Sequence, residues 1–293
     1  MRFPDYFMNR GQPVFSFELF PPKTARAMAT LQQALPELIA LRPDYLTVTY
    51  GAMGSTQEKT LEIATLIKQH YGMETACHLT CVGTSQAMLD ATLERIVQTG
   101  IRNIVALRGD PPQGETAFVP PPDGFAHASQ LVAHIRRFEQ QSQEALGIAV
   151  AGYPEKHLEA PDIDTDIAHL KRKVEAGGDV IITQLFFDNA HYFDFVARVR
   201  AAGITVPVVP GLMPILSAKQ IQRITSMCGA TIPPELQADL TAAGDDDTKT
   251  QSIGVRQCIR QAQELLGRGV PGIHFYVLNT ASQIRQIIEA LRW

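Results

Sequence analysis

Short apolar runs alternate along this chain with longer segments in which apolar residues recur every three or four positions. The short runs are rich in β-branched and aromatic residues and predict strands, whereas the longer segments predict amphipathic helices. The predicted strands cover residues 14–20, 45–50, 74–81, 101–107, 148–152, 179–185, 206–209 and 272–278. The predicted helices cover residues 24–39, 56–71, 85–99, 128–145, 162–176, 191–201, 218–228, 250–266 and 282–291. Each strand is therefore followed by at least one helix.

The order of these elements favours a closed barrel. Continuous apolar strands are covered on both faces, as in a parallel sheet flanked by helices, and each crossover is long enough to hold a helix. Eight such units in 293 residues, with no linker that would split the chain, predict a single-domain α/β fold, the (β/α)8 TIM barrel. The alternative is an open doubly wound sheet, which would usually carry a Gly-x-Gly-x-x-Gly turn after its first strand. Glu18-Leu19-Phe20-Pro21-Pro22 stands there instead.

Composition narrows the functional class. The chain is 45% hydrophobic and 19% charged, as in an ordinary globular protein, and its net charge of -4 argues against nucleic-acid binding. Its four cysteines have no paired spacing, so we expect neither a disulfide framework nor a metal site. The amino terminus has no apolar signal segment, and no segment approaches the roughly 18 apolar residues of a membrane span. We therefore expect a cytoplasmic protein with a small-molecule ligand and no membrane or nucleic-acid partner.

The fourth predicted strand opens into Arg108-Gly109-Asp110, which offers three complementary chemistries in adjacent positions. Arginine binds phosphate or stacks on a ring, glycine lets a ligand approach the backbone, and aspartate accepts hydrogen bonds. In a barrel the active site gathers at the carboxyl ends of the strands, so this position favours a functional interpretation. The alternative is a strand end capped by a surface ion pair and a proline turn.

Other strand ends also carry polar residues. Glu18 follows Phe17 in apolar surroundings that would desolvate a carboxylate and raise its pKa, which suits a general acid, although a structural carboxylate is the alternative. His78 alone is more often a buried histidine with a backbone partner than a catalyst. Gln184 suits the amide edge of a heterocycle or, equally, a buried amide. The basic helical segment Lys171-Arg172-Lys173 is either a solvated face or a clamp on a diphosphate.

Seven short motifs, in chain order and one to a strand, together resemble the motif series of bacterial 5,10-methylenetetrahydrofolate reductase. They are Ser16-Phe17-Glu18-Leu19-Phe20-Pro21-Pro22, Val48-Thr49-Tyr50-Gly51-Ala52, His78-Leu79-Thr80-Cys81, Ala106-Leu107-Arg108-Gly109-Asp110, Tyr153-Pro154-Glu155, Ile182-Thr183-Gln184 and His274-Phe275-Tyr276. The resemblance covers nearly the whole chain. It implies a barrel that binds FAD, is reduced by NADH or NADPH, and converts 5,10-methylenetetrahydrofolate to 5-methyltetrahydrofolate, the two substrates taking turns over one flavin face.

The resemblance also implies roles for individual residues. Glu18 would be the general acid that protonates folate N10, and Asp110 would hold the pterin amide edge and tune the flavin. Glu18, Asp110, Gln184, Gln220 and Tyr276 would contact substrate, with Gln184 and Thr49 shared between folate and the nicotinamide nucleotide. The expected FAD-binding positions are Thr49, Tyr50, Ala52, His78, Arg108, Gly109, Asp110, Ala128, Tyr153, His157, Asp166, His169, Arg172 and Lys173. No metal ligand is implied.

This chain departs from the family pattern at three positions. Thr280 stands where bacterial relatives commonly have an arginine, and Ile224 stands where a phenylalanine can cover the folate rings. His127 replaces the tyrosine usual before Ala128. The chain ends at Trp293, without the carboxyl-terminal regulatory domain of eukaryotic relatives, so we do not expect inhibition by S-adenosylmethionine.

Two rival functions remain. One is a flavin-free, pterin-binding barrel of the methyltransferase type, which has no need of a diphosphate clamp. The other is a non-catalytic ligand-binding barrel. The residues leave open the choice between NADH and NADPH, and they neither require nor exclude a homo-oligomer.

Overall fold

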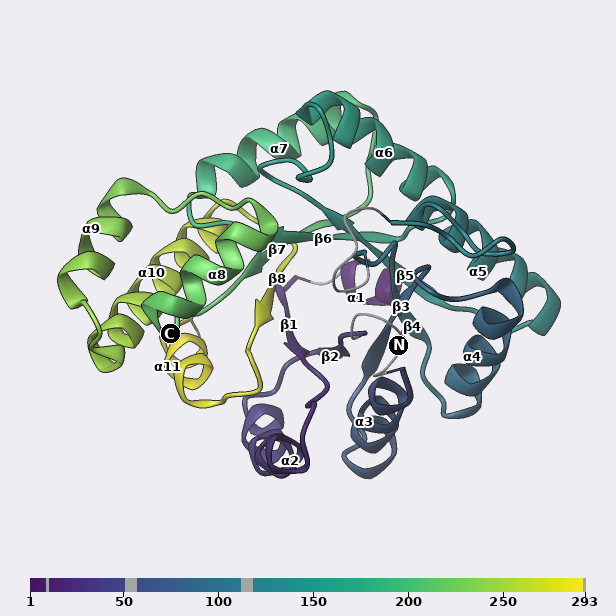
Figure 1. The fold of residues 1–293 in the computed structure, drawn as a ribbon, viewed down its shortest axis with the longest axis horizontal. Coiled ribbons are helices and arrows are strands. Elements are labelled where there is room, and N and C mark those ends of the chain that lie inside the picture. The colour runs from purple at the N-terminus through teal and green to yellow at the C-terminus, as the bar shows by residue number, and fades with distance from the viewer. Residues whose placement is uncertain (9–10, 51–56, 112–117, 292–293) are drawn as a thin grey trace.

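In the computed structural model, which describes residues 1–8, 11–50, 57–111 and 118–291, eight parallel strands close into a barrel in chain order (Figure 1). The strands are β1 (Val14–Leu19), β2 (Tyr45–Val48), β3 (Thr75–Thr80), β4 (Asn103–Leu107), β5 (Gly147–Gly152), β6 (Val180–Leu185), β7 (Val208–Leu212) and β8 (Gly272–Tyr276). Pairing of β8 with β1 closes the ring and confirms the predicted (β/α)8 barrel over the open sheet.

Helices surround the ring of strands on its outside (Figure 1). They are α2 (Ala25–Ala40), α3 (Gln57–His70), α4 (Gln86–Gln98), α5 (Ala128–Ser142), α6 (Ile163–Glu175), α7 (Asn189–Ala201), α8 (Ala218–Cys228), α9 (Pro234–Ala243), α10 (Asp247–Gly267) and α11 (Ser282–Leu291). The predicted helix starts agree best with the structure where a capping residue precedes the helix. Ser85 accepts a hydrogen bond from Met88 N, and Asp162 accepts one from Thr165 N, so these residues end the preceding loop.

A short helix that the apolar pattern did not predict, α1 (Phe3–Phe7), closes the amino-terminal end of the barrel (Figure 1). The rings of Phe3 and Tyr6 pack on Tyr45 at centroid distances of 5.2 and 5.1 Å. Phe3 N also donates a 2.6 Å hydrogen bond to Asn103 Oδ1. A helix of five residues is too short to show a helical period, so periodicity could not reveal it.

The barrel interior changes character along its axis. Near the amino-terminal ends of the strands it is apolar, with Val14, Tyr45 and Val105 in one buried cluster. Further along, the inward positions carry buried polar groups, including Ser16 and Thr47, neither of which is exposed. Alternate residues of a strand share one face, so this change continues directly to the strand ends where functional side chains gather.

The segment between β7 and β8 differs from the prediction by one added helix. Helix α9 lies within the stretch expected to be irregular, and α10 begins at Asp247, where residue 250 was predicted. The acidic residues 245–247 are exposed, and Asp246 caps α10 by accepting a hydrogen bond from Lys249 N. Among the residues described, no helix combines the length and the apolar composition needed to cross a membrane.

Candidate active site

Glu18 lies at the carboxyl end of β1, buried between two histidines from distant parts of the chain. Its Oε2 atom lies 3.2 Å from His274 Nε2 on β8 and 3.2 Å from His78 Nε2 on β3. The Glu18–His274 contact is a hydrogen bond. Nδ1 of His274 makes a second hydrogen bond, of 2.8 Å, with Ser16 Oγ. The predicted acid is therefore one member of a buried hydrogen-bonded chain.

The expectation of a raised pKa for Glu18 was wrong. Burial does favour the neutral carboxyl, but the neighbouring imidazoles of His78 and His274 outweigh it and lower the pKa of Glu18 to about 2. His274 stands 256 residues further along the chain, so the apolar neighbours of Glu18 in sequence gave no sign of it. Barrel closure supplies the missing information, because Ser16 and His274 are partners in the β1–β8 register.

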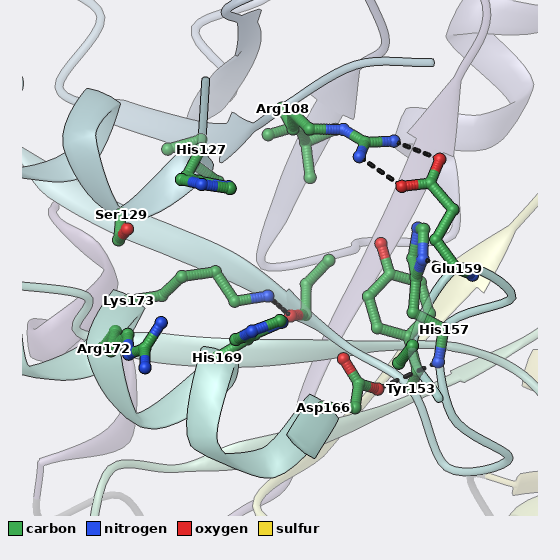
Figure 2. Close-up of a pocket in the computed structure, with 15 residues that line it drawn as sticks. Arg108, His127, Ser129, Tyr153, His157, Glu159, Asp166, His169, Arg172 and Lys173 are labelled. Carbon is green, nitrogen blue, oxygen red and sulfur yellow. Dashed lines mark hydrogen bonds and ion pairs between the residues drawn. The ribbon is translucent and has the colours of Figure 1, made fainter. Parts of the chain in front are cut away.

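A cavity of about 280 Å³ opens between β4, β5, α5 and α6 (Figure 2). Eight of the predicted FAD-binding residues line it: Arg108, Ala128, Tyr153, His157, Asp166, His169, Arg172 and Lys173. The structure adds lining residues that sequence reasoning did not assign to FAD: Ala106, Leu107, His127, Ser129, Ala151, Glu159 and Ala160. Ala151, Ala160 and Glu159 have no motif to mark them.

The cavity is cationic on both sides. Figure 2 shows Arg172 and Lys173 together on one side, with Arg108 across from them. The guanidinium of Arg108 pairs with both carboxylate oxygens of Glu159, at 2.5 and 2.7 Å. Lys171, the first residue of the basic triplet, does not line the cavity and lies 3.9 Å from Glu175 on the exposed face of α6. The triplet thus divides between the cavity wall and the exposed face of α6.

Lys173 is held at the wall of this cavity. Its Nζ donates a 2.6 Å hydrogen bond to Ala151 O and lies 5.7 Å from the ring centroid of Tyr153. Burial lowers the pKa of the Lys173 ammonium to about 8, although the carboxylate of Asp166 acts in the opposite direction. Asp166 in turn accepts a 2.9 Å hydrogen bond from His157 N, which orients it at the cavity floor.

The remaining predicted FAD positions that the structure describes lie at the barrel mouth beside this cavity, at the carboxyl ends of β2, β3 and β4. Thr49 and Tyr50 follow β2 and are half-buried, His78 is buried, and Asp110 is exposed. Gly109 has a φ of +86°, and a Cβ there would lie 2.8 Å from Val82 Cγ1, so only glycine fits this turn. Ala52 lies outside the described residues.

Three predicted substrate residues lie on the side of the mouth formed by β6 to β8. Gln184 Oε1 accepts a hydrogen bond from Leu185 N, and Gln220 Oε1 accepts one from Leu216 N. These bonds orient both amides, and Gln220 Nε2 is buried with no partner in the described part of the chain. Tyr276 Oη donates a 2.7 Å hydrogen bond to Thr183 O, which leaves its ring as the group available to a ligand.

Ile224 and Thr280, two positions at which the chain departs from the family pattern, have different surroundings on this side of the mouth. Ile224 packs against the apolar cluster that includes Met213 and Ile221, so it extends an apolar wall. Thr280 hydrogen-bonds through Oγ1 to Val277 O at 3.2 Å, and its short side chain supplies no positive charge.

Comparisons with known proteins identify one family, and the match covers nearly the whole chain. The sequence model of the methylenetetrahydrofolate reductase family matches residues 5–292. "Methylenetetrahydrofolate reductase (NADH) 1" of Arabidopsis thaliana is 40% identical over 280 residues, which are 92% of this chain and 47% of the plant protein. "5,10-methylenetetrahydrofolate reductase" of Escherichia coli is 36% identical over 283 residues, which are 96% of this chain and 92% of the bacterial protein. The chain thus spans about half the length of the plant relatives and nearly all of the bacterial one.

Solved structures share the fold at low sequence identity. A Clostridium thermocellum protein described as binding two copies of 5-methyl-5,6,7,8-tetrahydrofolic acid has a TM-score of 0.64 and 18% identity, with 98% of this chain and 96% of that chain covered. Oxaloacetate acetylhydrolase has a TM-score of 0.56 and 12% identity, with 99% and 86% covered. These likenesses establish the barrel architecture. The sequence motifs at the strand ends, the match over residues 5–292 and the bacterial relative of nearly equal length lead to one conclusion: the chain belongs to the methylenetetrahydrofolate reductase family.

Proposed function

We propose that this protein reduces 5,10-methylenetetrahydrofolate to 5-methyltetrahydrofolate, using bound FAD and a reduced nicotinamide nucleotide. The observation that carries the proposal is the position of buried Glu18 at the mouth of a barrel in which a cationic cavity opens at the ends of β4 and β5. The fold neighbour described as binding 5-methyltetrahydrofolic acid supports a folate ligand in a barrel of this shape. A flavin-free pterin barrel would not need the cationic cavity.

The residues of the cavity fit an FAD diphosphate. Arg108, Arg172 and Lys173 supply positive charge, and the N-terminal residues of α5, Ala128 and Ser129, line the same space. The volume of about 280 Å³ is near the lower limit for ligand pockets, so it would take part of the dinucleotide. The rest would extend along the mouth toward Thr49, Tyr50, His78, Gly109 and Asp110. When bound, FAD supplies hydride transfer from the nicotinamide nucleotide to the folate.

The protein's own groups would bind and orient the folate. The carboxylate of Asp110 is exposed at the mouth, where it can accept hydrogen bonds from the pterin amide edge. Gln220 Nε2 is a buried donor without a partner among the residues that the structure describes, as expected of a group reserved for a ligand. Gln184 and the ring of Tyr276 would complete this side of the site. Because both substrates would contact Thr49 and Gln184, the folate and the nicotinamide nucleotide would occupy the same position in turn.

Glu18 would hold the proton that folate N10 receives as the five-membered ring opens. Protonation lets the N10–carbon bond break with its electron pair on N10, and the N5 lone pair then forms the iminium that accepts hydride at carbon. The lowered pKa of Glu18 means that the carboxylate is ionised near neutral pH before substrate binds. A neighbouring group must therefore supply its proton.

The test is to purify the protein, record its visible spectrum, release the chromophore by denaturation and assay folate reduction with NADH and NADPH in parallel. We expect yellow protein that releases FAD and reduces the folate. The plant relatives are named as NADH enzymes, which supports NADH as the better donor. Colourless protein that FAD cannot reconstitute, yet that binds the folate, would favour the flavin-free pterin barrel.

A further inference from the structure

His274 is fully buried and hydrogen-bonded through both ring nitrogens, an arrangement that the role of Glu18 alone does not explain. Ser16, its partner at Nδ1, and Glu18, its partner at Nε2, are two residues apart on β1 and face the same side of the strand. Tyr276 packs edge-on against the imidazole at a centroid distance of 5.2 Å and an interplanar angle of 88°. The ring is therefore held in one orientation, with Nε2 directed at the carboxylate.

Other groups also face Glu18. From β3, His78 Nε2 approaches the same oxygen to 3.2 Å, but without the hydrogen-bond geometry of the His274 contact. From β8, burial and the charge of Glu18 raise the pKa of the Tyr276 phenol well above its usual range, so it stays neutral. From β2, Thr47 is the register partner of Glu18 and carries no charge. The imidazoles are thus the groups that can pass a proton to Glu18 near neutral pH, and His274 is the one aligned by hydrogen bonds.

We infer that His274 supplies Glu18 with the proton that Glu18 delivers to the substrate, and that Ser16 is a positioning residue for this transfer. The inference rests on the proposed function and names a further member of its proton path. In the proposed path, the hydrogen-bonded pair of His274 Nε2 and Glu18 Oε2 holds the transferable proton before reaction.

The transfer balances without a further reactant. The Nε2–H bond of His274 breaks and an O–H bond forms on Glu18 Oε2. This O–H bond then breaks as the N–H bond forms at folate N10. His274 is left neutral with its remaining proton on Nδ1, where Ser16 Oγ accepts the hydrogen bond. The pair regains its proton from water after the product leaves.

The experiment measures the two half-reactions of the FAD-loaded enzyme separately by stopped flow: reduction by NADH, and reoxidation by the folate across a range of pH. The main variant is His274→Gln, which keeps a hydrogen-bonding side chain but carries no proton to transfer. His134→Gln is a matched control, because His134 is also buried and lies 2.7 Å from a carboxylate, that of Asp90, outside the site. Ser16→Ala and His78→Gln complete the set.

We expect His274→Gln to slow reoxidation by about 10²-fold, the lower end for general acid catalysis, with reduction by NADH within a few-fold of wild type. In wild type, reoxidation should slow as rising pH removes the proton held by the His274–Glu18 pair, and this pH dependence should vanish in His274→Gln. Ser16→Ala should slow reoxidation by about tenfold through loss of one hydrogen bond to a charged group. His134→Gln should match wild type in both half-reactions.

A purely structural role for His274 would slow both half-reactions together or leave the pH dependence in place, and either result overturns the inference. The inference is also overturned if the pH dependence is lost in His78→Gln but retained in His274→Gln. If His274→Gln does not fold, Ser16→Ala decides, because unchanged reoxidation in that variant is incompatible with the proposed path. Failure of the proposed function is recognised separately, since wild-type protein would then show no flavin or no folate-dependent reoxidation.

Discussion

Arg108 and Glu159 form a two-point ion pair at the wall of the cavity, with guanidinium nitrogens 2.5 and 2.7 Å from the two carboxylate oxygens. Arg108 is one of the cations expected to bind FAD. In the structure its positive charge is already offset by the carboxylate of Glu159. The pair lowers the pKa of Glu159 through this hydrogen bonding, so its carboxylate is ionised at neutral pH. An incoming diphosphate therefore meets a cation that is already partnered.

Removing that competing charge should strengthen cofactor binding. Glu159→Gln should raise FAD affinity by about two- to fivefold, the effect expected of one half-exposed ion pair, measured by titrating apoprotein and following flavin fluorescence. Asp164→Asn removes the same charge from the exposed face of α6, away from the cavity, and should leave the affinity unchanged. Weaker binding by Glu159→Gln would show that Glu159 orients Arg108 for the cofactor instead of competing with it.

Lys173 should make FAD binding depend on pH. Its pKa of about 8 in the free protein would rise when a diphosphate binds, because the anion favours the ammonium form. Affinity should therefore be constant below about pH 8 and fall by up to about tenfold per pH unit above it, as the free lysine loses its proton. Lys173→Met should bind FAD more weakly and lose this dependence, whereas Lys171→Met, on the exposed face of the same helix, should behave like wild type. A wild-type affinity that does not change between pH 7 and 9 would contradict the role of Lys173.

The turn at Gly109 offers a test of stability with an internal control. Gly109→Ala combines a positive φ with a contact of 2.8 Å to Val82, and should cost about 2 to 4 kcal/mol. Gly203 has a similar φ of +81° but open space around its Cα, so Gly203→Ala should cost only about 1 kcal/mol. Urea unfolding followed by circular dichroism measures both. Equal losses would show that Val82 moves aside without cost.

Thr280 stands where bacterial relatives commonly have an arginine, which the family resemblance associates with the glutamate tail of the folate. A charge-assisted bond to a folate carboxylate contributes about 1.5 to 3 kcal/mol, so Thr280→Arg should lower the folate KM by about tenfold or more. Thr280→Gln, of comparable length but uncharged, should have a much smaller effect. If Thr280→Arg leaves the folate KM unchanged, another residue already holds the tail.

The barrel was predictable because its signal is repeated and local. Each strand is a continuous apolar run and each crossover a helical period, and a single irregularity, such as α9, does not disturb the pattern. Helix α1 was not predicted because its contacts, such as that of Phe3 N with Asn103, join residues 100 positions apart. Its packing is a property of the closed barrel and not of its own five residues.

The candidate site was predictable where side chains follow strand ends, and less so where their environment matters. Arg108 and Tyr153 were identified from motifs at strand ends and Lys173 from a basic helical segment, and all three line one cavity. The ionisation of Glu18 was not predictable from its neighbours in sequence, because His274 reaches it only through the β1–β8 pairing. Glu159 was missed because an acidic residue in a polar loop has no distinguishing pattern.

The central claim is that Glu18 delivers a proton to the folate, and Glu18→Gln tests it most directly because the substitution keeps the shape of the side chain but removes the transferable proton. The measurement is stopped-flow kinetics of each half-reaction in the FAD-loaded variant. Reoxidation by 5,10-methylenetetrahydrofolate should slow by about 10²- to 10⁴-fold, while reduction by NADH, which needs no acid, should stay within a few-fold of wild type. Equal slowing of both half-reactions would make Glu18 a structural or cofactor-binding residue, and unchanged reoxidation would place the acid elsewhere.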